Sequence, residues 1–162
     1  MRLLSFEAQK CLSCHSCELA CAVAHSQSNS LYTAATYGEK VLARLFVLKG
    51  SPFGWVVFCR HCLRAPCLEV CPTEAIQRTS SGAVVIKAER CIGCQDCLRA
   101  CPFGVIQING NKAVKCDLCG GDPACVKSCP TGALSFLEPA EESRRKRLWA
   151  AKKFLFSARR ST

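Results

Sequence analysis

The chain has 162 residues, of which 16 are cysteine, and it carries a formal net charge of +10. This length suits one domain or two very small ones, and so high a cysteine content is typical of disulfide scaffolds or metal proteins. Disulfides need an oxidising compartment, but the nine residues between Met1 and Cys11 hold no apolar leader, and no apolar run could span a membrane. We therefore expect a cytoplasmic metal protein. Metal-bound cysteines are thiolates and offset much of the positive charge, so we expect no nucleic-acid partner.

The cysteines fall into four groups of four along the chain. The first and third groups have the spacing C-x2-C-x2-C-x3-C, and the second and fourth widen the middle interval to four and five residues. The groups are Cys11, Cys14, Cys17, Cys21; Cys59, Cys62, Cys67, Cys71; Cys91, Cys94, Cys97, Cys101; and Cys116, Cys119, Cys125, Cys129. Such runs hold 4Fe–4S clusters in bacterial ferredoxins. Four thiolates for each cluster predict four 4Fe–4S clusters, with all sixteen cysteines as iron ligands.

Zinc is the competing metal for a chain so rich in cysteine. Zinc ligands usually come as two separated pairs of cysteines, whereas each group here is a nearly contiguous quartet, and three of the four end in Cys-Pro. Soft thiolate ligands also suit the iron of a cluster. The spacing therefore favours iron–sulfur clusters over zinc.

The cysteine loops contain small residues that permit tight turns: Ser13, Ser16, Gly93, Gly120 and Gly121. Tight loops would aim backbone N–H groups at cluster sulfurs. His15 and His61 also lie inside the loops, and we interpret them as ordinary loop residues, although either could donate a hydrogen bond to a cluster sulfur. His25 has no evident partner, and Asp96 and Asp117 are expected to form local hydrogen bonds.

The segment between the first two groups, residues 22–58, is an insertion. Ala22 stands where the other groups have proline, so the helix after the first group is expected to continue towards His25. The apolar runs Val41–Leu48 and Trp55–Phe58 flank a Gly/Pro turn and predict a hairpin. This hairpin would shield the clusters from water or, alternatively, form a docking surface.

Three cysteine groups are followed by similar sequences, CPTEAI, CPFGVI and CPTGAL, which form an internal repeat. We expect short strands at Ala83–Ile86, Val105–Ile108 and Leu134–Leu137. Gly82 and the pair Asn109-Gly110 supply the turns of tight hairpins. The prediction is an α+β fold of two intertwined ferredoxin-like modules with short hairpins and helices, followed by a C-terminal helix.

In two-cluster ferredoxins the last cysteine of each run binds the cluster of the other run. Nineteen residues separate Cys71 from Cys91, which suits one compact module. We therefore pair the second group with the third in an inner module, 59–109, and the first with the fourth in an outer module, 1–30 plus 110–137. The predicted ligand sets are Cys59, Cys62, Cys67 with Cys101; Cys91, Cys94, Cys97 with Cys71; Cys11, Cys14, Cys17 with Cys129; and Cys116, Cys119, Cys125 with Cys21. Pairing the groups sequentially is the alternative, but it leaves a 37-residue gap inside one module.

The tail, residues 138–162, is basic, with 8 Lys and Arg against 3 Asp and Glu. Pro139 followed by Glu141 and Glu142 predicts the start of a helix. One face of this helix would hold Leu148, Trp149, Lys152, Leu155, Phe156 and Arg159. Because exposed aromatic side chains favour association, we expect this face to pack on its own domain, on another subunit, on a second copy of the chain, or on an anionic membrane surface.

The cysteine pattern of residues 11–137 resembles the four-cluster iron–sulfur subunits of multi-subunit oxidoreductases, such as those of dimethyl-sulfoxide reductase, formate dehydrogenase and formate hydrogenlyase. The resemblance implies two ferredoxin-like modules, with the first group paired with the fourth and the second with the third, and a relay beside a catalytic subunit. CHSCELACAVAHSQS (Cys14–Ser28) is similar to small members that serve nickel carbon monoxide dehydrogenase. CDLCGGDPACVKSCPTGAL (Cys116–Leu134) is similar to those serving tungsten aldehyde:ferredoxin oxidoreductases, the partner we slightly favour.

The sequence contains no nucleophile–base pair, no phosphate-binding glycine loop and no dinucleotide fingerprint. We therefore expect a non-catalytic electron-transfer subunit. Electrons would pass between a catalytic tungsten or nickel metalloenzyme subunit and a second redox subunit or ferredoxin. The alternative function is that of a free-standing polyferredoxin shuttle.

Overall fold

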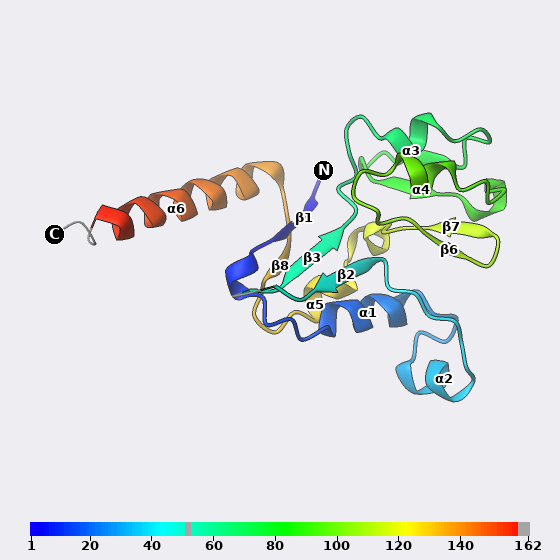
Figure 1. Ribbon diagram of the computed structural model, residues 1–162, viewed down its shortest axis with the longest axis horizontal. Helices are drawn as coiled ribbons and strands as arrows, with labels where there is room; N and C mark the ends of the chain where they lie inside the picture. Colours follow the sequence, from blue (N-terminus) through cyan, green and yellow to red (C-terminus); the bar gives the residue numbers. More distant parts are fainter. Residues whose placement is uncertain (51–52, 159–162) are drawn as a thin grey trace.

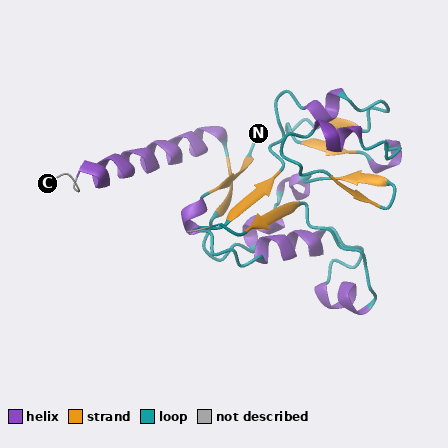
Figure 2. Ribbon diagram, viewed as in Figure 1, coloured by secondary structure: helices purple, strands orange, loops and turns teal. Residues whose placement is uncertain are grey.

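Short helices alternate with pairs of short strands along the chain, so the fold is α+β, as the sequence predicts (Figure 1 and Figure 2). The computed structural model describes residues 1–50 and 53–158, with side chains as far as Ala151. The strands are β1 (Leu3–Phe6), β2 (Leu45–Leu48), β3 (Trp55–Phe58), β4 (Ile76–Arg78), β5 (Val84–Ile86), β6 (Gln107–Asn109), β7 (Lys112–Val114) and β8 (Leu134–Leu137). The helices are α1 (Ser16–Ala24), α2 (Leu31–Thr36), α3 (Pro66–Glu69), α4 (Asp96–Ala100), α5 (Ala124–Lys127) and α6 (Pro139–Ala158), with 3-10 turns at Ala8–Lys10, Ala88–Arg90 and Leu118–Gly121.

Two hairpins follow the second and third cysteine groups. Strand β4 pairs with β5, and β6 pairs with β7, both antiparallel. Gly82 and Gly110 take positive φ at the turns, as the sequence predicts. The sequence predicts a strand at Val105–Ile108, but the observed strand begins two residues later, at Gln107. Val105 and Ile106 lie before the strand and are buried in the core.

The predicted hairpin in the insertion is confirmed, with its first strand shortened. Strand β2 pairs antiparallel with β3, and Leu45 lies opposite Phe58. Both side chains are almost completely buried. Apolar residues alternate towards the core along β2, which fixes the register of the pair.

The pairing of β1 with β8 joins the beginning of the chain to the end of the last cysteine group. Leu3 lies opposite Leu137, and Phe6 lies opposite Leu134. The sequence predicts the strand at Leu134–Leu137 but not its partner, because four residues without a neighbouring turn give no hairpin signal.

The buried side chains form two clusters, and cysteines belong to both of them. One cluster gathers β1, β2, β3 and β8 around cysteines of the first, second and fourth groups. The other gathers β4, β5 and β7 around cysteines of the second and third groups. Helix α1 packs on α5, and α3 packs on α4. The helices that carry the cysteines therefore pack in two pairs.

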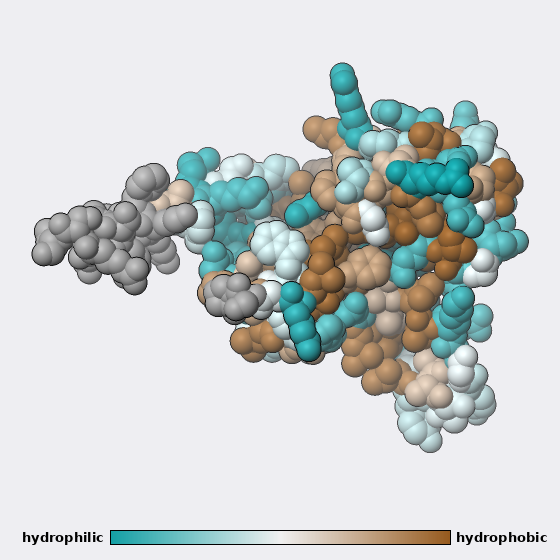
Figure 3. Space-filling view, viewed as in Figure 1, coloured by the Kyte–Doolittle hydropathy of each residue, from teal (hydrophilic) through white to brown (hydrophobic). Residues whose placement is uncertain are grey.

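Helix α6 begins at Pro139, as predicted, and extends away from the body (Figure 1). Hydrophilic side chains gather near the beginning of this helix, while hydrophobic ones lie mostly over the body (Figure 3). Leu148 and Trp149 are both about half exposed. The other members of the predicted face, Lys152, Leu155, Phe156 and Arg159, lie outside the described side chains. Within the described part of the chain, no helix has the length and apolar character needed to cross a bilayer.

Candidate metal centres

The four cysteine loops share one feature of the backbone. The residue before the second cysteine has a positive φ in every loop: 53° at Ser13, 47° at His61, 72° at Gly93 and 61° at Leu118. A left-handed residue turns the chain back on itself, so the cysteines on either side of it curl around one centre. Three of these four residues are not glycine, and strain of roughly 1–3 kcal/mol per residue persists only where the surroundings impose it, often at functional sites.

Three cavities are each lined by four cysteines. Each has three cysteines from one loop and the last cysteine of another loop. Their cysteines are Cys11, Cys14, Cys17 and Cys129 (site I); Cys59, Cys62, Cys67 and Cys101 (site II); and Cys91, Cys94, Cys97 and Cys71 (site III). In these cavities the first loop meets the last cysteine of the fourth group, and the second and third loops each meet the last cysteine of the other.

The remaining four cysteines also lie close together. Burial of Cys125 raises the pKa of its thiol, and the neighbouring charges of Cys116, Cys21 and Cys119 raise it further. Cys21 reaches this group from α1, which packs on α5, the helix that carries Cys125. We name this group site IV.

The four sites are also neighbours of one another. Burial is the main reason that the pKa values of three thiols are raised, to about 11 for Cys97 and about 12 for Cys116. The charge of a cysteine in the next site contributes in each case: Cys67 acts on Cys97, Cys59 on Cys116, and Cys17 on Cys125. Packing gives the order III, II, IV, I. Helix α3 packs on α4, which joins sites II and III, and α1 packs on α5, which joins sites I and IV. Lys115 donates hydrogen bonds to both Cys59 and Cys116, which joins sites II and IV. Cys94 of site III and Cys14 of site I are the two exposed cysteines, so both ends of this series reach the surface.

The residues of these sites fit an iron–sulfur cluster. Backbone N–H groups donate to cysteine sulfurs at three of them: from Arg44 to Cys21 at 3.3 Å, from His61 to Cys59 at 3.5 Å, and from Ala113 to Cys91 at 3.4 Å. Hydrogen bonds to sulfur and an all-thiolate donor set are features of bound clusters. Burial raises the pKa values of Cys17, Cys97 and Cys116, so metal binding must displace protons from these sulfurs.

The structure gives His25 a partner that the sequence does not reveal. Its Nε2 lies 3.1 Å from Asp117 Oδ1, and its Nδ1 lies 2.7 Å from the carbonyl oxygen of Cys21. Arg44 donates to the other oxygen of Asp117 at 2.7 Å. The hydrogen bond with Asp117 is the main reason that the pKa of His25 is raised to about 12. Burial alone would raise the pKa of Asp117, but hydrogen bonding to His25 and the charge of Arg44 outweigh it and hold the pKa below its usual range.

Asp117 also accepts a hydrogen bond from the N–H of Cys119 at 2.9 Å, which is the local bond expected from the sequence. Helix α1 continues past Cys21 to Ala24, with His25 as its C-cap, as the alanine after Cys21 predicts. The His25–Asp117–Arg44 network therefore ties α1 and the insertion to the fourth cysteine loop beside site IV.

His61 is not an ordinary loop residue, which corrects the interpretation from the sequence. It is only 2 % exposed, and its Nδ1 accepts a hydrogen bond from the N–H of Val84 at 3.0 Å. Burial is the main cause that lowers its pKa to about 4. Lys115, which has no distinctive signal in the sequence, is buried beside it and donates to Cys59 Sγ. His15 does behave as a surface loop residue, with Nδ1 2.6 Å from Glu18.

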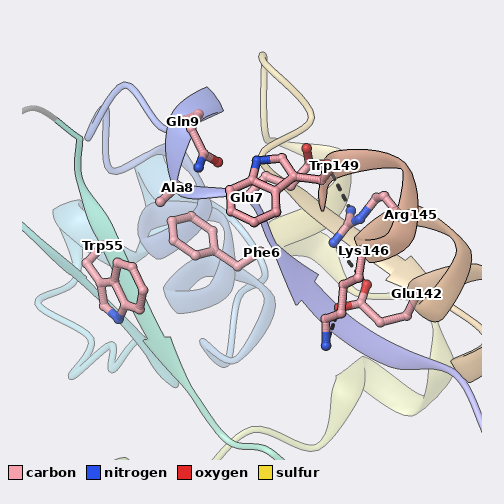
Figure 4. A pocket seen from close by; sticks show the side chains of 9 residues that line it. All are labelled: Phe6, Glu7, Ala8, Gln9, Trp55, Glu142, Arg145, Lys146 and Trp149. Carbon is pink, nitrogen blue, oxygen red and sulfur yellow. Dashed lines mark hydrogen bonds and ion pairs between the residues drawn. The ribbon is translucent and has the colours of Figure 1, made fainter. Parts of the chain in front are cut away.

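A pocket lies where α6 leaves the body, and Phe6, Trp55 and Trp149 are among its lining residues (Figure 4). Phe6 also lines site I, and its ring meets that of Trp55 edge-on with 5.8 Å between the ring centres. On the other side of the pocket, Arg145 pairs with Glu7 at 3.0 Å. The beginning of α6 is therefore fixed close to site I.

Cysteine loops repeated on paired hairpins, with cavities lined by four sulfurs, define a ferredoxin-type iron–sulfur protein. The comparison with protein families agrees, because residues 55–139 match the model of the 4Fe-4S dicluster domain. The chain belongs to this family.

Several relatives match a stretch of more than 100 residues of the chain. The electron transport protein HydN of Escherichia coli (strain K12) is 40 % identical over 107 residues, which cover 66 % of this chain and 59 % of HydN. An iron-sulfur protein of Rhodospirillum rubrum is 43 % identical over 104 residues, 64 % of this chain and 54 % of that protein. Formate hydrogenlyase subunit 2 of E. coli (strain K12) is 35 % identical over 111 residues, 68 % of this chain and 50 % of the subunit. The matches thus span between half and two thirds of these relatives.

Proposed function

We propose that this chain is a non-catalytic electron-transfer protein that binds four 4Fe–4S clusters. Each cluster, when bound, takes up and releases one electron. The ligands would be the four cysteines of sites I to IV, as grouped above. The family match supports 4Fe–4S clusters, and the names of HydN and of the R. rubrum protein support electron transport by an iron–sulfur protein.

The order of the sites is the observation that carries this proposal. Sites III, II, IV and I form a series of neighbours through helix packing and Lys115, and only the two end sites have an exposed cysteine among the described residues. Leu12 beside site I is 68 % exposed, and Ile92 beside site III is 64 % exposed. Exposed apolar residues next to an exposed ligand are suited to contact with a partner protein. Electrons would therefore enter at one end and leave at the other.

The residues around the middle sites serve to exclude water. Leu45, Val56 and Phe58 of the insertion hairpin pack in the same cluster as cysteines of sites II and IV. Shielding a cluster from solvent is one of the ways in which a protein sets its potential. The body, 1–137, would comprise an inner module around sites II and III and an outer one around sites I and IV.

The partners follow from the relatives and from the family resemblance. The similarity to a formate hydrogenlyase subunit supports a catalytic oxidoreductase at one end and a further redox subunit or ferredoxin at the other. We favour a tungsten aldehyde oxidoreductase over a nickel carbon monoxide dehydrogenase, both in the cytoplasm. The beginning of α6, close to site I, places the basic helix where it could bind such a subunit.

Anaerobic purification from the native host, with iron, sulfide, zinc, tungsten and nickel measured on one sample, tests this function. About sixteen irons and sixteen sulfides per chain are expected. Tungsten or nickel in the same fraction would identify the catalytic partner, and elution as a lone monomer would favour the shuttle instead. Zinc near four atoms per chain with little iron would refute the proposal.

A further inference from the structure

Lys115 lies inside the body with all its hydrogen-bonding capacity used. The residue is 3 % exposed. Its Nζ donates to Cys59 Sγ at 3.4 Å, to the carbonyl oxygen of Cys116 at 3.0 Å, and to the carbonyl oxygen of Val84. An ammonium group has three donors and no acceptor, so three acceptors match its charged form. Lys115 therefore brings a positive charge into contact with a sulfur of site II.

His61 provides a second donor at the same site. Its Nδ1 accepts from the N–H of Val84, so the ring proton is on Nε2. Nε2 is buried and has no hydrogen-bond partner within the described part of the protein, and the ring lines the cavity of site II together with the four cysteines. A buried N–H without an acceptor costs about 1–3 kcal/mol. The sulfur atoms of a bound cluster would supply the missing acceptor.

Because the second and third cysteine groups are repeats of each other, the surroundings of site II can be compared with those of site III. Gly93 of site III corresponds to His61, and Ala113 on β7 corresponds to Val84 on β5. In site III the N–H of Ala113 donates directly to Cys91 Sγ. In site II the ring of His61 accepts the N–H of Val84, and the ammonium group of Lys115 donates to Cys59 Sγ instead. A side chain at Gly93 is excluded, because an added Cβ would lie 2.2 Å from the carbonyl oxygen of Asn111.

On the basis of the proposed function, we propose that Lys115 and His61 raise the reduction potential of the cluster in site II, because they place a positive charge and an N–H donor beside it. Reduction adds a negative charge to the cluster, and a nearby cation or N–H donor stabilises that charge. Site III has a neutral backbone donor at the corresponding place, so the two halves of the inner module differ in potential. An electron in the inner pair would then reside on site II, next to site IV, rather than at the exposed site III.

The test is an anaerobic redox titration of the whole chain, followed by electron paramagnetic resonance, with Lys115→Met as the main variant. One of the one-electron steps should move to lower potential by at least tenfold in its equilibrium constant, about 59 mV. Lys115→Arg retains the charge, so the potential of this step should stay close to that of the native chain. Lys87→Met removes the same charge from an exposed residue of the neighbouring segment and should leave every step in place.

A step that does not move in Lys115→Met, or an equal shift of all steps, would overturn the inference while leaving the proposed function intact. If Lys115→Met does not retain its clusters, pulsed resonance on the native chain labelled with ¹⁵N at lysine Nζ decides the question. A lysine nitrogen coupled to one reduced cluster is expected, and the absence of coupling would refute the contact. A native chain that binds no 4Fe–4S cluster would refute the proposed function instead.

Discussion

Arg145 attaches α6 to the body, and its replacement by methionine should release the helix. The guanidinium group donates to Ser135 Oγ at 2.6 Å and also to Ser5, and it pairs with Glu7 at 3.0 Å and Glu142 at 2.9 Å. Glu7 follows β1, and Glu142 lies in the first turns of α6. Arg145 therefore connects the segment after β1 with the beginning of α6. Methionine has a similar helix propensity, so Arg145→Met removes the attachment and keeps the helix-forming tendency.

The magnitude follows from the burial of these groups. The side chains of Arg145, Glu7 and Glu142 are 25 %, 23 % and 20 % exposed. A charged hydrogen bond of a buried group is worth about 1.5–3 kcal/mol, whereas an exposed ion pair is worth less than about 1 kcal/mol. We take about 2 kcal/mol for the partly buried set, which corresponds to roughly a 25-fold larger fraction of detached helix.

Hydrogen exchange measured by mass spectrometry on the cluster-loaded chain checks this prediction. A detached helix of this length frays in water, so the amides at the beginning of α6 should exchange faster in Arg145→Met. Arg147→Met is the matched control, because Arg147 is exposed and carries the same charge in the same helix. Equal exchange in the native chain and Arg145→Met, or equal acceleration in both variants, would refute the role of Arg145.

Three further predictions concern the metal sites. Cys101→Ala should expose Cys59, Cys62 and Cys67 of site II to alkylating reagents while the cysteines of site III stay protected, and Cys71→Ala should expose Cys91, Cys94 and Cys97 while site II stays protected; exposure of cysteines of the first or fourth group instead would contradict the ligand sets. Asp117→Asn leaves Arg44 and His25 without their anion and should destabilise the loaded chain by about 2 kcal/mol, measured as a lower denaturant midpoint with visible absorbance as the signal; an unchanged midpoint would contradict this. Removal of iron by chelation should abolish near-ultraviolet circular dichroism and increase dye binding, because buried cysteines are part of both core clusters; a native spectrum without iron would contradict it.

The parts of the fold that the sequence predicts are those governed by neighbours along the chain. The turn at Gly82, the turn at Gly110 and the start of α6 at Pro139 all depend on local backbone preferences. The pairing of β1 with β8 depends on contact between the two ends of the body, and four residues of Leu3–Phe6 carry no pattern that names a partner. Long-range pairing of short strands is therefore the part that sequence reasoning misses.

The residues of the candidate site also fall into those with a local signal in the sequence and those that only the fold brings together. Cysteine spacing is a local pattern, so the four loops follow from the sequence, whereas the assignment of their cysteines to clusters stays a prediction. In the sequence, by contrast, nothing distinguishes Lys115 from the other Lys and Arg residues, of which there are 22 in all. Its position between Cys59 and Cys116 is seen only in the fold. The network of His25, Asp117 and Arg44 likewise joins three separate segments. The positive charge next to Cys59 in site II could be found only once the segments had been brought together.

The pairing of β1 with β8 also imposes an order on biosynthesis. The first strand emerges from the ribosome early, but its partner is the last strand of the body. The inner hairpins, β4–β5 and β6–β7, pair within short stretches and can close while translation continues. The first cysteine loop must wait, unpaired, until Leu134–Leu137 has been made. Strand β1 and the loop that follows it can therefore reach their final places only after the whole body has been synthesised.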